Sequence, residues 1–529
     1  MPIKHIFTNN MPNNIADKWT FFYTTPPLSP FQVAIVVTNY NRIVINENIT
    51  LWCGSCLQNQ QLFNFAKRIT ENITLHLKAE FSETDVDIPK MDHFVIPNFV
   101  QDGTSKWGLI FHTETNLIYD EQSDSVVRKI EVARLIAHKI AYQWFNNIYN
   151  SSSWSYDHFP LHDGLAAYFG EEAIYKNLNY SEIKDFLIVH IQYESLHLDS
   201  YFNMNPVEIT NSSKFVSLFS FPRYLNVLIV LRMLRIAISD IEFRRAVHMY
   251  VHLTFHSTIS IDFSSKIRSK SNICYVPSYK FLTWQKYRGY PIVVLRLENY
   301  YFGILSQKLS YNLTTDGNWW IFINLKNVIK APFTLRDDLV CIRPKMSNFI
   351  KQDQINWTHN FIVDIEQAGY YRVKYETEGW QTITKYLTST TGEYNNISAI
   401  NRAKIVDDAF HLMMEHQLNA SIFWNLTQYL SQETNYVAWY PMFKIFEYMS
   451  TIFPFSEEEI KFDFKTKFTE LLNEPLKTIE NNTYRVPNYF IKCLKQEILR
   501  WACTLQHQHC VRMAKHTLEE HLENPDKNP

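Results

Sequence analysis

A long amphipathic segment, a short polar loop and a second helical segment constrain the fold of this chain more than any other feature. Residues 125–146 place apolar side chains at helical spacing, and LHDGLAAYF at residues 161–169 belongs to the next helix. His138 and Tyr142 stand at positions i and i+4 of the first segment, so their side chains share one face of the helix. The pattern predicts two successive helices, with His138 on the first and Asp163 near the start of the second.

The residues on these two helices differ from a zinc-peptidase motif at the positions that carry the chemistry. Such a motif reads H-E-x-x-H, with a third carboxylate ligand on the following helix. This chain instead has His138, Lys139 and Tyr142, followed by Asp163. A neutral phenol is a poor zinc ligand, and a protonated lysine cannot take a proton from a zinc-bound water. The fold pattern and the chemical residues therefore point in different directions.

The composition is that of an ordinary globular protein. The 529 residues suffice for roughly three or four domains of about 150 residues each. Hydrophobic residues make up 46% and charged residues 20%, and the formal net charge of −2 argues against nucleic-acid binding or a polybasic membrane surface. The sequence predicts no transmembrane segment, because its most apolar window, Leu225 to Ile238, is interrupted by Arg232 and Arg235. Residues 1–14 lack the apolar core of a signal peptide.

The cysteines and the N-x-S/T sequons bear on the cellular compartment. Seven cysteines are too few for a disulfide-rich scaffold, although Cys503 and Cys510 stand close together and could pair. Cys53 and Cys56 form a single C-x-x-C without a second pair at zinc-finger spacing. This favours a local disulfide or two packed thiols over a metal or redox role. Eleven sequons, Asn48 among them, favour a secretory-pathway protein with possible N-glycans.

The remaining periodicities predict regions of strand and helix along the chain. Residues 31–45 predict one or two strands, 56–78 a helix, and 107–119 a strand and its return. Helices follow to about residue 257. PIVVLRL and FGILSQKL predict a hairpin within a small β-sandwich, and helical periods resume at Gly379 and continue to the end of the chain.

Several segments, taken in order, resemble the membrane alanyl aminopeptidases, which are aminopeptidase N-like gluzincins. The matching segments are HKIAYQWFNN at 138–147, LHDGLAAYF at 161–169, WGLIFHTETNLIYD at 107–120, YLNVLIVLRML at 224–234, and INRAKIVDDAF, YLSQETNYVAWY and ILRWACTLQHQHC in the C-terminal part. Each segment alone is a moderate signal, and their shared order and spacing make the resemblance specific. The resemblance covers nearly the whole chain and includes the family's C-x6-C pair, here Cys503 and Cys510.

The resemblance implies a multidomain α+β fold. Residues 1–48 would be the end, or remnant, of an N-terminal β-domain, and 49–280 a thermolysin-like α/β peptidase domain. Residues 281–374 would form a small β-sandwich, and 375–529 part of a C-terminal α-helical superhelix. On this template the chain begins late in the β-domain and stops within the helical domain. We therefore expect either a truncated product or an incomplete gene model.

The resemblance also implies the positions of the metal ligands and of the general base. His138 would be the first zinc ligand, Tyr142 replaces the second histidine, and Asp163 takes the place of the glutamate ligand. Aspartate reaches one methylene less than glutamate. Lys139 replaces the glutamate that serves as general base, and its charge opposes a nearby cation. The implied cofactor is zinc, and these replacements predict that zinc binds weakly or not at all.

The substrate positions that the resemblance implies are also altered. The family's G-x-M-E-N strand corresponds to the residues just before Trp107, with Gly103 as a substrate-binding position. Ser105 replaces the glutamate that holds the free α-amine of the substrate, and Lys106 replaces the asparagine after it. The tyrosine that steadies the oxyanion survives as Tyr224. An aminopeptidase needs an anion at the position that Ser105 occupies, so we expect recognition of the amine to be lost.

These replacements predict a catalytically inactive aminopeptidase N-like protein that binds peptides or a protein partner at the cell surface or outside the cell. The alternative is an active zinc-dependent aminopeptidase with an atypical metal site, which cleaves N-terminal residues from peptides. A third possibility is a non-functional gene fragment. His158 and His162, with His138 or Asp163, would supply a displaced metal site. Pro160 between the first two disfavours a regular helix there.

The same side chains also have purely structural interpretations. His138 can be a core histidine that is hydrogen-bonded to Asp163 or Tyr224, and this is favoured over a ligand role. Tyr142 can fill the volume of a lost metal pocket. Lys139 can pair with Asp163 or attract a peptide carboxylate.

Overall fold

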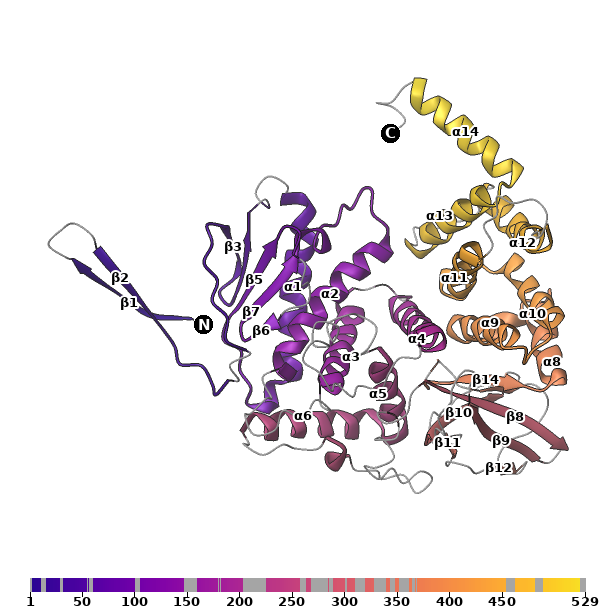
Figure 1. The fold of residues 1–529 in the computed structure, drawn as a ribbon, viewed down its shortest axis with the longest axis horizontal. Helices are drawn as coiled ribbons and strands as arrows, with labels where there is room; N and C mark the ends of the chain where they lie inside the picture. The colour runs from indigo at the N-terminus through magenta and orange to yellow at the C-terminus, as the bar shows by residue number, and fades with distance from the viewer. Residues whose placement is uncertain are drawn as a thin grey trace. The chain divides into compact units, whose positions relative to one another are not determined.

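The structure is a computed structural model in which the chain forms two compact units (Figure 1). One unit comprises Met1–Ile183 and Tyr201–Arg288, and the other Lys184–Ser200 and Gly289–Pro529. The described residues are 2–10, 16–28, 32–54, 56, 60–99, 105–146, 159–178, 180, 182–202, 225–256, 263–267, 284, 289–299, 302–309, 319–327, 339–342, 348–351, 361–363, 367, 369–452, 462–480 and 489–523.

The first unit contains a five-stranded sheet that supports the candidate site. Its order is β3 (Asn41–Asn46), β4 (Ile49–Cys53), β5 (Met91–Ile96), β7 (Leu109–Thr113) and β6 (Ser105–Lys106). β4, β5 and β7 run parallel, whereas the edge strands β3 and β6 are antiparallel to their neighbours. The central strand β5 is buried at Met91–Val95, as expected for a parallel strand that is covered on both faces.

Helices complete the first unit. They are α1 (Gln60–Glu80), α2 (Val126–Asn146), α3 (Phe159–Asn177), α5 (Leu225–Ile238) and α6 (Asp240–His256), with short 3-10 helices η2 (Ser82–Thr84), η3 (Glu114–Asn116) and η6 (Phe263–Lys266). A separate hairpin pairs β1 (Ile3–Asn10) with β2 (Ala16–Phe22). Phe81 contacts the rings of Trp144, Phe145 and Phe169, which places an aromatic core between α2 and α3. Gly170 lets these helices approach closely, because a Cβ there would lie 3.1 Å from the Ala137 carbonyl carbon.

The second unit contains two sheets followed by helices. The four-stranded sheet has the order β12 (Asn348–Lys351), β9 (Phe302–Leu309), β8 (Pro291–Asn299) and β14 (Arg372–Tyr375). The three-stranded sheet has the order β11 (Leu339–Ile342), β10 (Ile321–Asn327) and β13 (Phe361–Val363). The helices are α4 (Ile183–Phe202), α8 (Thr377–Leu387), α9 (Ala399–Met414), α10 (Ala420–Thr427), α11 (Tyr436–Ile452), α12 (Phe462–Glu480), α13 (Tyr489–Thr504) and α14 (Gln508–Glu523), with η8 (Glu393–Asn396) and η9 (Gln428–Gln432). The fold is therefore mixed helix and sheet.

Helix α4 belongs to the second unit, although its sequence lies between segments of the first. The Phe186 ring contacts the rings of Tyr436 and Tyr440 on α11. Near the other end of α4, the Tyr370 hydroxyl donates a hydrogen bond to the Asp199 carboxyl. Burial raises the pKa of Asp199 to about 6, although that hydrogen bond acts in the opposite direction. Apolar and polar contacts thus attach α4 to the rest of the second unit along the length of the helix.

Most sequence-based elements are confirmed. Helices α1, α2 and α3 lie where helical spacing predicts them, and β8 and β9 form the expected antiparallel hairpin. The expected return strand after β7 was wrong: a 3-10 turn occupies 114–116, closed by a bond from the Leu117 amide to the Glu114 carbonyl. Of the strands expected at 31–45, only 41–45 is strand, as part of β3, and residue 31 lies outside the described residues.

High exposure explains the error before β3. Val33, Ile35 and Val37 are 64%, 87% and 94% exposed, so little of the described chain packs against them, and β-branched residues alone do not make a strand without such packing. The candidate disulfides are both present, Cys53 with Cys56 and Cys503 with Cys510. Among the described residues, no helix is both long and apolar enough to cross a bilayer.

An ionic cluster joins α1 to α6 in the first unit. The Arg244 guanidinium contacts Glu80 at 2.5 Å and Asp240 at 3.0 Å, and it also bonds to Glu172. The His248 ring Nε2 lies 3.2 Å from the same Glu80 carboxylate. This cluster therefore ties the end of α1 to the helix that follows α5.

The stability of the first unit is expected to decline with acid because of Glu80. Burial alone would raise the pKa of Glu80, but the His248 hydrogen bond and the Arg244 charge lower it from 4.5 to about 2. Since the folded-state pKa lies below the unfolded one, ionised Glu80 stabilises the fold above pH 4.5 and this contribution is lost as the pH falls toward 2. Urea unfolding between about pH 6 and about pH 3 should show a smaller loss of stability for Glu80→Gln than for the unaltered chain. Equal losses of stability for the two chains would contradict the assignment of this acid sensitivity to Glu80.

Candidate functional site

Two helices and one edge strand carry the candidate site in the first unit. His138, Lys139 and Tyr142 lie on α2, Asp163 on the first half of α3, and Ser105 on β6. α2 and α3 pack along one another, and α2 also contacts β6, so the three elements bring these residues into one region. The expected oxyanion residue Tyr224 and the expected substrate-binding residue Gly103 lie outside the described residues.

His138 and Asp163 face one another across the two helices. The His138 Nε2 lies 4.0 Å from an Asp163 carboxyl oxygen, and the Tyr142 ring is stacked beside the imidazole with centroids 6.0 Å apart. Burial, together with the charges of Arg134 and Lys139, lowers the pKa of His138 to about 3. Burial raises the pKa of Asp163 to about 8. At neutral pH the imidazole is therefore uncharged and the carboxyl favours its protonated form, and at 4.0 Å the two groups are too far apart for a hydrogen bond.

Lys139 points into the sheet. Its side chain is 2% exposed, and its ammonium donates a hydrogen bond to the Phe111 carbonyl oxygen of β7 at 2.8 Å. The same nitrogen lies 3.3 Å from the His112 Nδ1, and the other ring nitrogen of His112 lies 3.0 Å from the His93 Nδ1. Burial, followed by the Lys139 charge, lowers the pKa of His112 well below its usual range, so this ring is neutral and can accept from the ammonium. Lys139 thus connects α2 to β7 and, through two histidines, to β5.

Ser105 is likewise bonded inward. Its hydroxyl is buried and donates to the Lys139 carbonyl oxygen at 3.2 Å. The Gln143 side-chain amide donates to the Ser105 hydroxyl and, at 2.9 Å, to the Lys106 carbonyl oxygen. The carbonyl oxygen of the same side chain accepts from the Gly108 amide at 2.9 Å. Gln143 therefore fastens the β6–β7 turn to α2, with Ser105 at the centre of the contact.

Restoring an acidic side chain at Ser105 is expected to disrupt this contact. Ser105→Glu adds atoms and a charge to a site that is 3% exposed, so we expect a loss of about 1–3 kcal/mol in the free energy of unfolding. Ser105→Ala removes only the hydroxyl and should cost about 1 kcal/mol. Chemical denaturation of both variants measures the difference. If Ser105→Glu is as stable as the unaltered chain, the conclusion that the Ser105 side chain is tightly packed against α2 is wrong.

The expected displaced metal site depends on two histidines, of which the structure describes one. His162 is buried in the first turns of α3, and its Nε2 lies 2.7 Å from the Tyr250 hydroxyl on α6. The expectation that Pro160 disfavours a helix here was wrong: α3 begins at Phe159, and Pro160 lies in its first turn, where its missing N–H is tolerated. His158 lies outside the described residues. The observed contact of His162 is that of a core histidine.

The side chains of the candidate site do not match the ligand set of a catalytic zinc ion. Such a site has three nitrogen, sulfur or carboxylate ligands and an open position for water. Here the side chains of suitable type are His138 and Asp163, and the third position presents the phenol of Tyr142. In the part of the chain that the structure describes, no three His, Cys, Asp or Glu side chains are grouped so that they could hold a metal ion.

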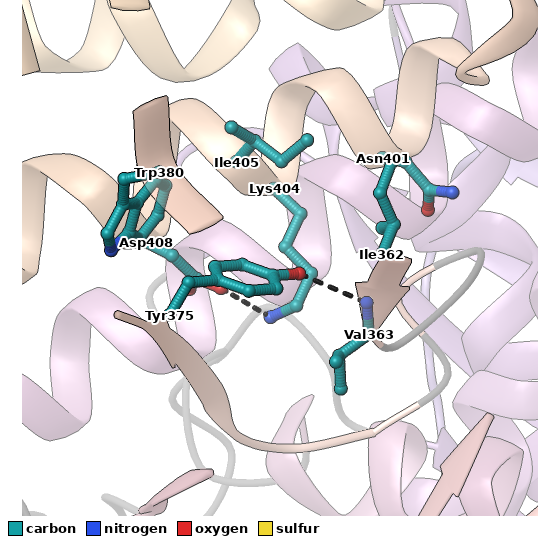
Figure 2. Close-up of a pocket in the computed structure, with 8 residues that line it drawn as sticks. All are labelled: Ile362, Val363, Tyr375, Trp380, Asn401, Lys404, Ile405 and Asp408. Atoms are coloured by element: carbon teal, nitrogen blue, oxygen red, sulfur yellow. Dashed lines mark hydrogen bonds and ion pairs between the residues drawn. The ribbon is translucent and has the colours of Figure 1, made fainter. Parts of the chain in front are cut away.

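A small cavity in the second unit is too small to hold a peptide. Figure 2 shows its lining, which is Ile362, Val363, Tyr375, Trp380, Asn401, Lys404, Ile405 and Asp408. Its volume is about 10 Å³, enough for about one water, whereas ligand pockets usually exceed about 300 Å³. The Val363 amide donates to the Tyr375 hydroxyl at 3.0 Å, and Lys404 pairs with Asp408 at 3.1 Å. The cavity is therefore a packing feature between β13, β14 and α9.

Sequence reasoning found the altered positions but not the residues that hold them. His93, His112 and Gln143 were not singled out, although each contacts a replaced residue or its partner. A signal was present, since two histidines on buried strands and a glutamine beside the catalytic-helix motif are polar residues at positions where burial is expected. Their relation to Lys139 depends on strand register, which the sequence pattern does not specify.

Comparisons with known proteins agree with this architecture. Residues 65–279 match the peptidase family M1 domain, and residues 360–529 match the ERAP1-like C-terminal domain. The first match spans the sheet strands β5 to β7 and the helices that carry the candidate site. Together the matches define an M1-type peptidase domain followed by the C-terminal domain that accompanies it in this chain.

Similarity extends over almost the whole chain. Human aminopeptidase N is 25% identical over 540 residues, which are 96% of this chain and 54% of that protein. Aminopeptidase Ey of chicken is 24% identical over 100% of this chain and 56% of its own length, and glutamyl aminopeptidase of pig is 24% identical over 98% and 56%. The chain thus spans about half the length of these relatives. The two domain matches and this similarity support an aminopeptidase N-like family member.

Proposed function

We propose that this protein is a catalytically inactive aminopeptidase N-like homologue that binds peptides or a protein partner at the cell surface or outside the cell. The single observation that carries this proposal is the direction of the Lys139 side chain. Its ammonium is bonded to the Phe111 carbonyl and to His112, so the residue at the general-base position is part of the sheet contact. Loss of a general base alone typically lowers a rate by about 100- to 10,000-fold.

The neighbouring replacements support the same proposal. Tyr142 stands where the resemblance implies a second histidine ligand, so the zinc ion that the family would supply for activating water lacks one donor. Ser105 stands where a glutamate would hold the substrate's amine, and it is bonded to Gln143 and the Lys139 carbonyl. Metal, base and amine recognition are therefore all altered in one region of the first unit.

We also infer the finer organisation of the chain from the resemblance. Residues 1–48 would be the end of an N-terminal β-domain, 49–280 a thermolysin-like peptidase domain, 281–374 a β-sandwich and 375–529 part of a helical superhelix. The M1 match at 65–279 supports the second range, and the C-terminal match from residue 360 onward supports a change of domain in this part of the chain.

Disulfide bonding supports a location outside the cytosol. Cys53, Cys56, Cys503 and Cys510 are paired, and Cys341 is also disulfide-bonded. Disulfides persist mainly in oxidising compartments, where N-glycosylation also takes place. An extracellular glycoprotein is therefore the form in which we expect the protein to act.

The proposal is tested by metal content and turnover in one preparation of the full chain. We expect well under one zinc ion per chain and, on aminoacyl fluorophores, a turnover at least about 10,000-fold below that of an aminopeptidase N assayed alongside. His138→Ala is the matched control, because it removes the remaining histidine ligand position. Stoichiometric zinc that is lost in His138→Ala, together with chelator-sensitive turnover, would instead establish the atypical zinc-dependent aminopeptidase.

Peptide binding is tested separately with paired ligands. Fluorescent peptides with a free N-terminus and the same peptides with an acetylated N-terminus should bind with equal affinity, because Ser105 supplies no charge for the amine. A preference of about tenfold or more for the free amine would show that another anion has taken over this role. Absence of binding to either series would direct the search to a protein partner.

A further inference from the structure

Helix α14, which Figure 1 draws in yellow, carries an apolar stripe on a side that faces solvent. Val511, Leu518 and Leu522 are 45%, 57% and 69% exposed. They are spaced by seven and then four residues, so they lie along one side of the helix. Among the residues of α14, all of which the structure describes, Cys510 alone is buried, and its disulfide with Cys503 fastens the first turn to α13. The helix is thus held at its start while its apolar stripe stays exposed.

A row of charged residues runs along one flank of this stripe. Arg512 and Lys515 form the N-terminal half of the row, and Glu519 and Glu523 form its C-terminal half. Successive members of the row are three or four residues apart, so they share one side of the helix. All four side chains are exposed. This charged flank therefore changes from positive to negative along the helix.

The charged flank is complementary to itself when two copies of α14 pair antiparallel. A two-fold axis between the copies makes every contact between two different residues occur twice. In an antiparallel helix pair the same flank of both helices meets, and charges beside the apolar seam decide partner and orientation. Residues of opposite charge then face one another: Arg512 with Glu523 of the second copy, and Lys515 with Glu519.

The apolar stripe fits the same arrangement. Val511 of one copy lies beside Leu522 of the other, and Leu518 of both copies lies close to the two-fold axis. A parallel pair would place the charged flank against the opposite flank of the second helix, where Ala514 and Thr517 supply no opposite charge. The antiparallel pair is therefore the one that covers the apolar residues and pairs the charges together.

We propose that α14 is a dimerisation helix that pairs antiparallel with α14 of a second copy of this chain. A helix of 16 residues is about 24 Å long, so the pair buries less than the roughly 1,600 Å² of a standard interface, and the dimer is weak, with a micromolar Kd. Three glutamates against one arginine and one lysine make α14 acidic, which disfavours an anionic membrane surface as the occupant of the stripe. The proposal does not depend on peptidase activity, because α14 belongs to the second unit and the candidate site to the first.

Sedimentation velocity of the full chain between about 1 and about 200 µM measures the association. We expect a reversible monomer–dimer equilibrium whose Kd rises at least about threefold between about 50 mM and about 500 mM NaCl, because salt screens the charge contacts. Leu518→Asp places two like charges near the two-fold axis and should raise the Kd at least about tenfold. A chain that stays monomeric at about 200 µM would overturn the proposal, as would a monomer that instead binds vesicles of phosphatidylcholine and phosphatidylglycerol through α14.

Two charge-reversed variants test the antiparallel pairing directly. Arg512→Glu combined with Lys515→Glu makes the charged flank wholly acidic, and Glu519→Lys combined with Glu523→Lys makes it wholly basic. Each variant alone should dimerise at least about tenfold more weakly than the unaltered chain, because like charges then face one another. An equimolar mixture of the two should form a heterodimer at least as tight as the dimer of the unaltered chain, because every contact across the pair again joins opposite charges.

A control variant separates this pairing from a general effect of charge. Lys385→Glu combined with Lys477→Glu changes the net charge as much as the acidic variant does, at exposed positions on α8 and α12, and should leave the Kd unchanged. Circular dichroism confirms that each variant is folded, which we expect because every altered side chain is exposed. A dimer that tolerates both charge reversals, or a mixture that does not associate, would assign the association to another surface and overturn the proposal.

Discussion

Replacing Lys139 by glutamate is expected to lower the free energy of unfolding by about 3–5 kcal/mol and to create no peptidase activity. In this buried position the ammonium donates to the Phe111 carbonyl and faces the neutral ring of His112. A carboxylate would meet a carbonyl oxygen there and would be left as an uncompensated buried charge. The substitution that restores the expected general base would therefore damage the contact between α2 and the sheet.

Chemical denaturation and an aminoacyl-fluorophore assay measure the two parts of this result. Lys139→Met keeps the length of the side chain and removes its charge, so it should cost about 1–3 kcal/mol through the unsatisfied Phe111 carbonyl. Glu131→Lys reverses a charge on the exposed face of the same helix and should cost at most about 1 kcal/mol. A Lys139→Glu chain with unchanged stability and chelator-sensitive turnover would refute both the structural role and the proposed inactivity.

Replacing Arg372 by methionine is expected to destabilise the second unit by about 3–5 kcal/mol. Arg372 is 0% exposed, and its guanidinium lies 2.7 Å from the Asp407 carboxylate and 3.3 Å from that of Asp408. Its Nε also donates to the Tyr290 hydroxyl at 3.1 Å. Burial opposes its charge, but these two carboxylates outweigh that effect and raise the pKa of Arg372 well above its usual range. Without the guanidinium, the Asp407 carboxylate would lose its closest cation inside the fold.

A surface arginine supplies the control for this prediction. Arg500 is 49% exposed at its side chain and pairs with Glu447 at 2.9 Å and Glu497 at 3.0 Å. Arg500→Met should change the free energy of unfolding by at most about 1 kcal/mol, because exposed ion pairs are screened by solvent. Urea unfolding of both variants, followed by circular dichroism, gives the comparison. Similar losses for the two arginines would mean that burial of the Arg372 cluster does not determine its contribution.

The fold was largely accessible from the sequence because its strongest elements are periodic. The apolar spacing of α1 and α2 and the β-branched runs of β8 and β9 depend on local pattern, and the structure has them where the pattern places them. The segment at 33–37 has the same residue types but stays largely exposed among the described residues, and whether a strand finds a partner is not local information. Pairing of β14 with β8 in parallel joins residues too distant in sequence for any pattern to predict.

The positions of the candidate site could be predicted from the sequence, but the contacts of its side chains could not. The resemblance places His138, Lys139 and Ser105 at positions of known type, and their replacement is visible without coordinates. The direction of each side chain depends on partners elsewhere in the chain. Lys139 contacts the Phe111 carbonyl only because β7 passes beneath α2 at that residue, and Ser105 contacts Gln143 only because β6 lies against the same helix.

Helix α4 has a consequence for how this protein can be divided. The chain leaves the first unit after Ile183 and returns to it at Tyr201, so no single cut separates the two units. A fragment ending at Arg288 would carry α4 without Tyr370 and Tyr440, exposing the apolar side of the helix and the Asp199 carboxyl. A fragment beginning at Gly289 would lack the helix that covers the same tyrosines. Fragments intended to isolate either half should therefore be designed around α4, by deleting it from the first and supplying it to the second.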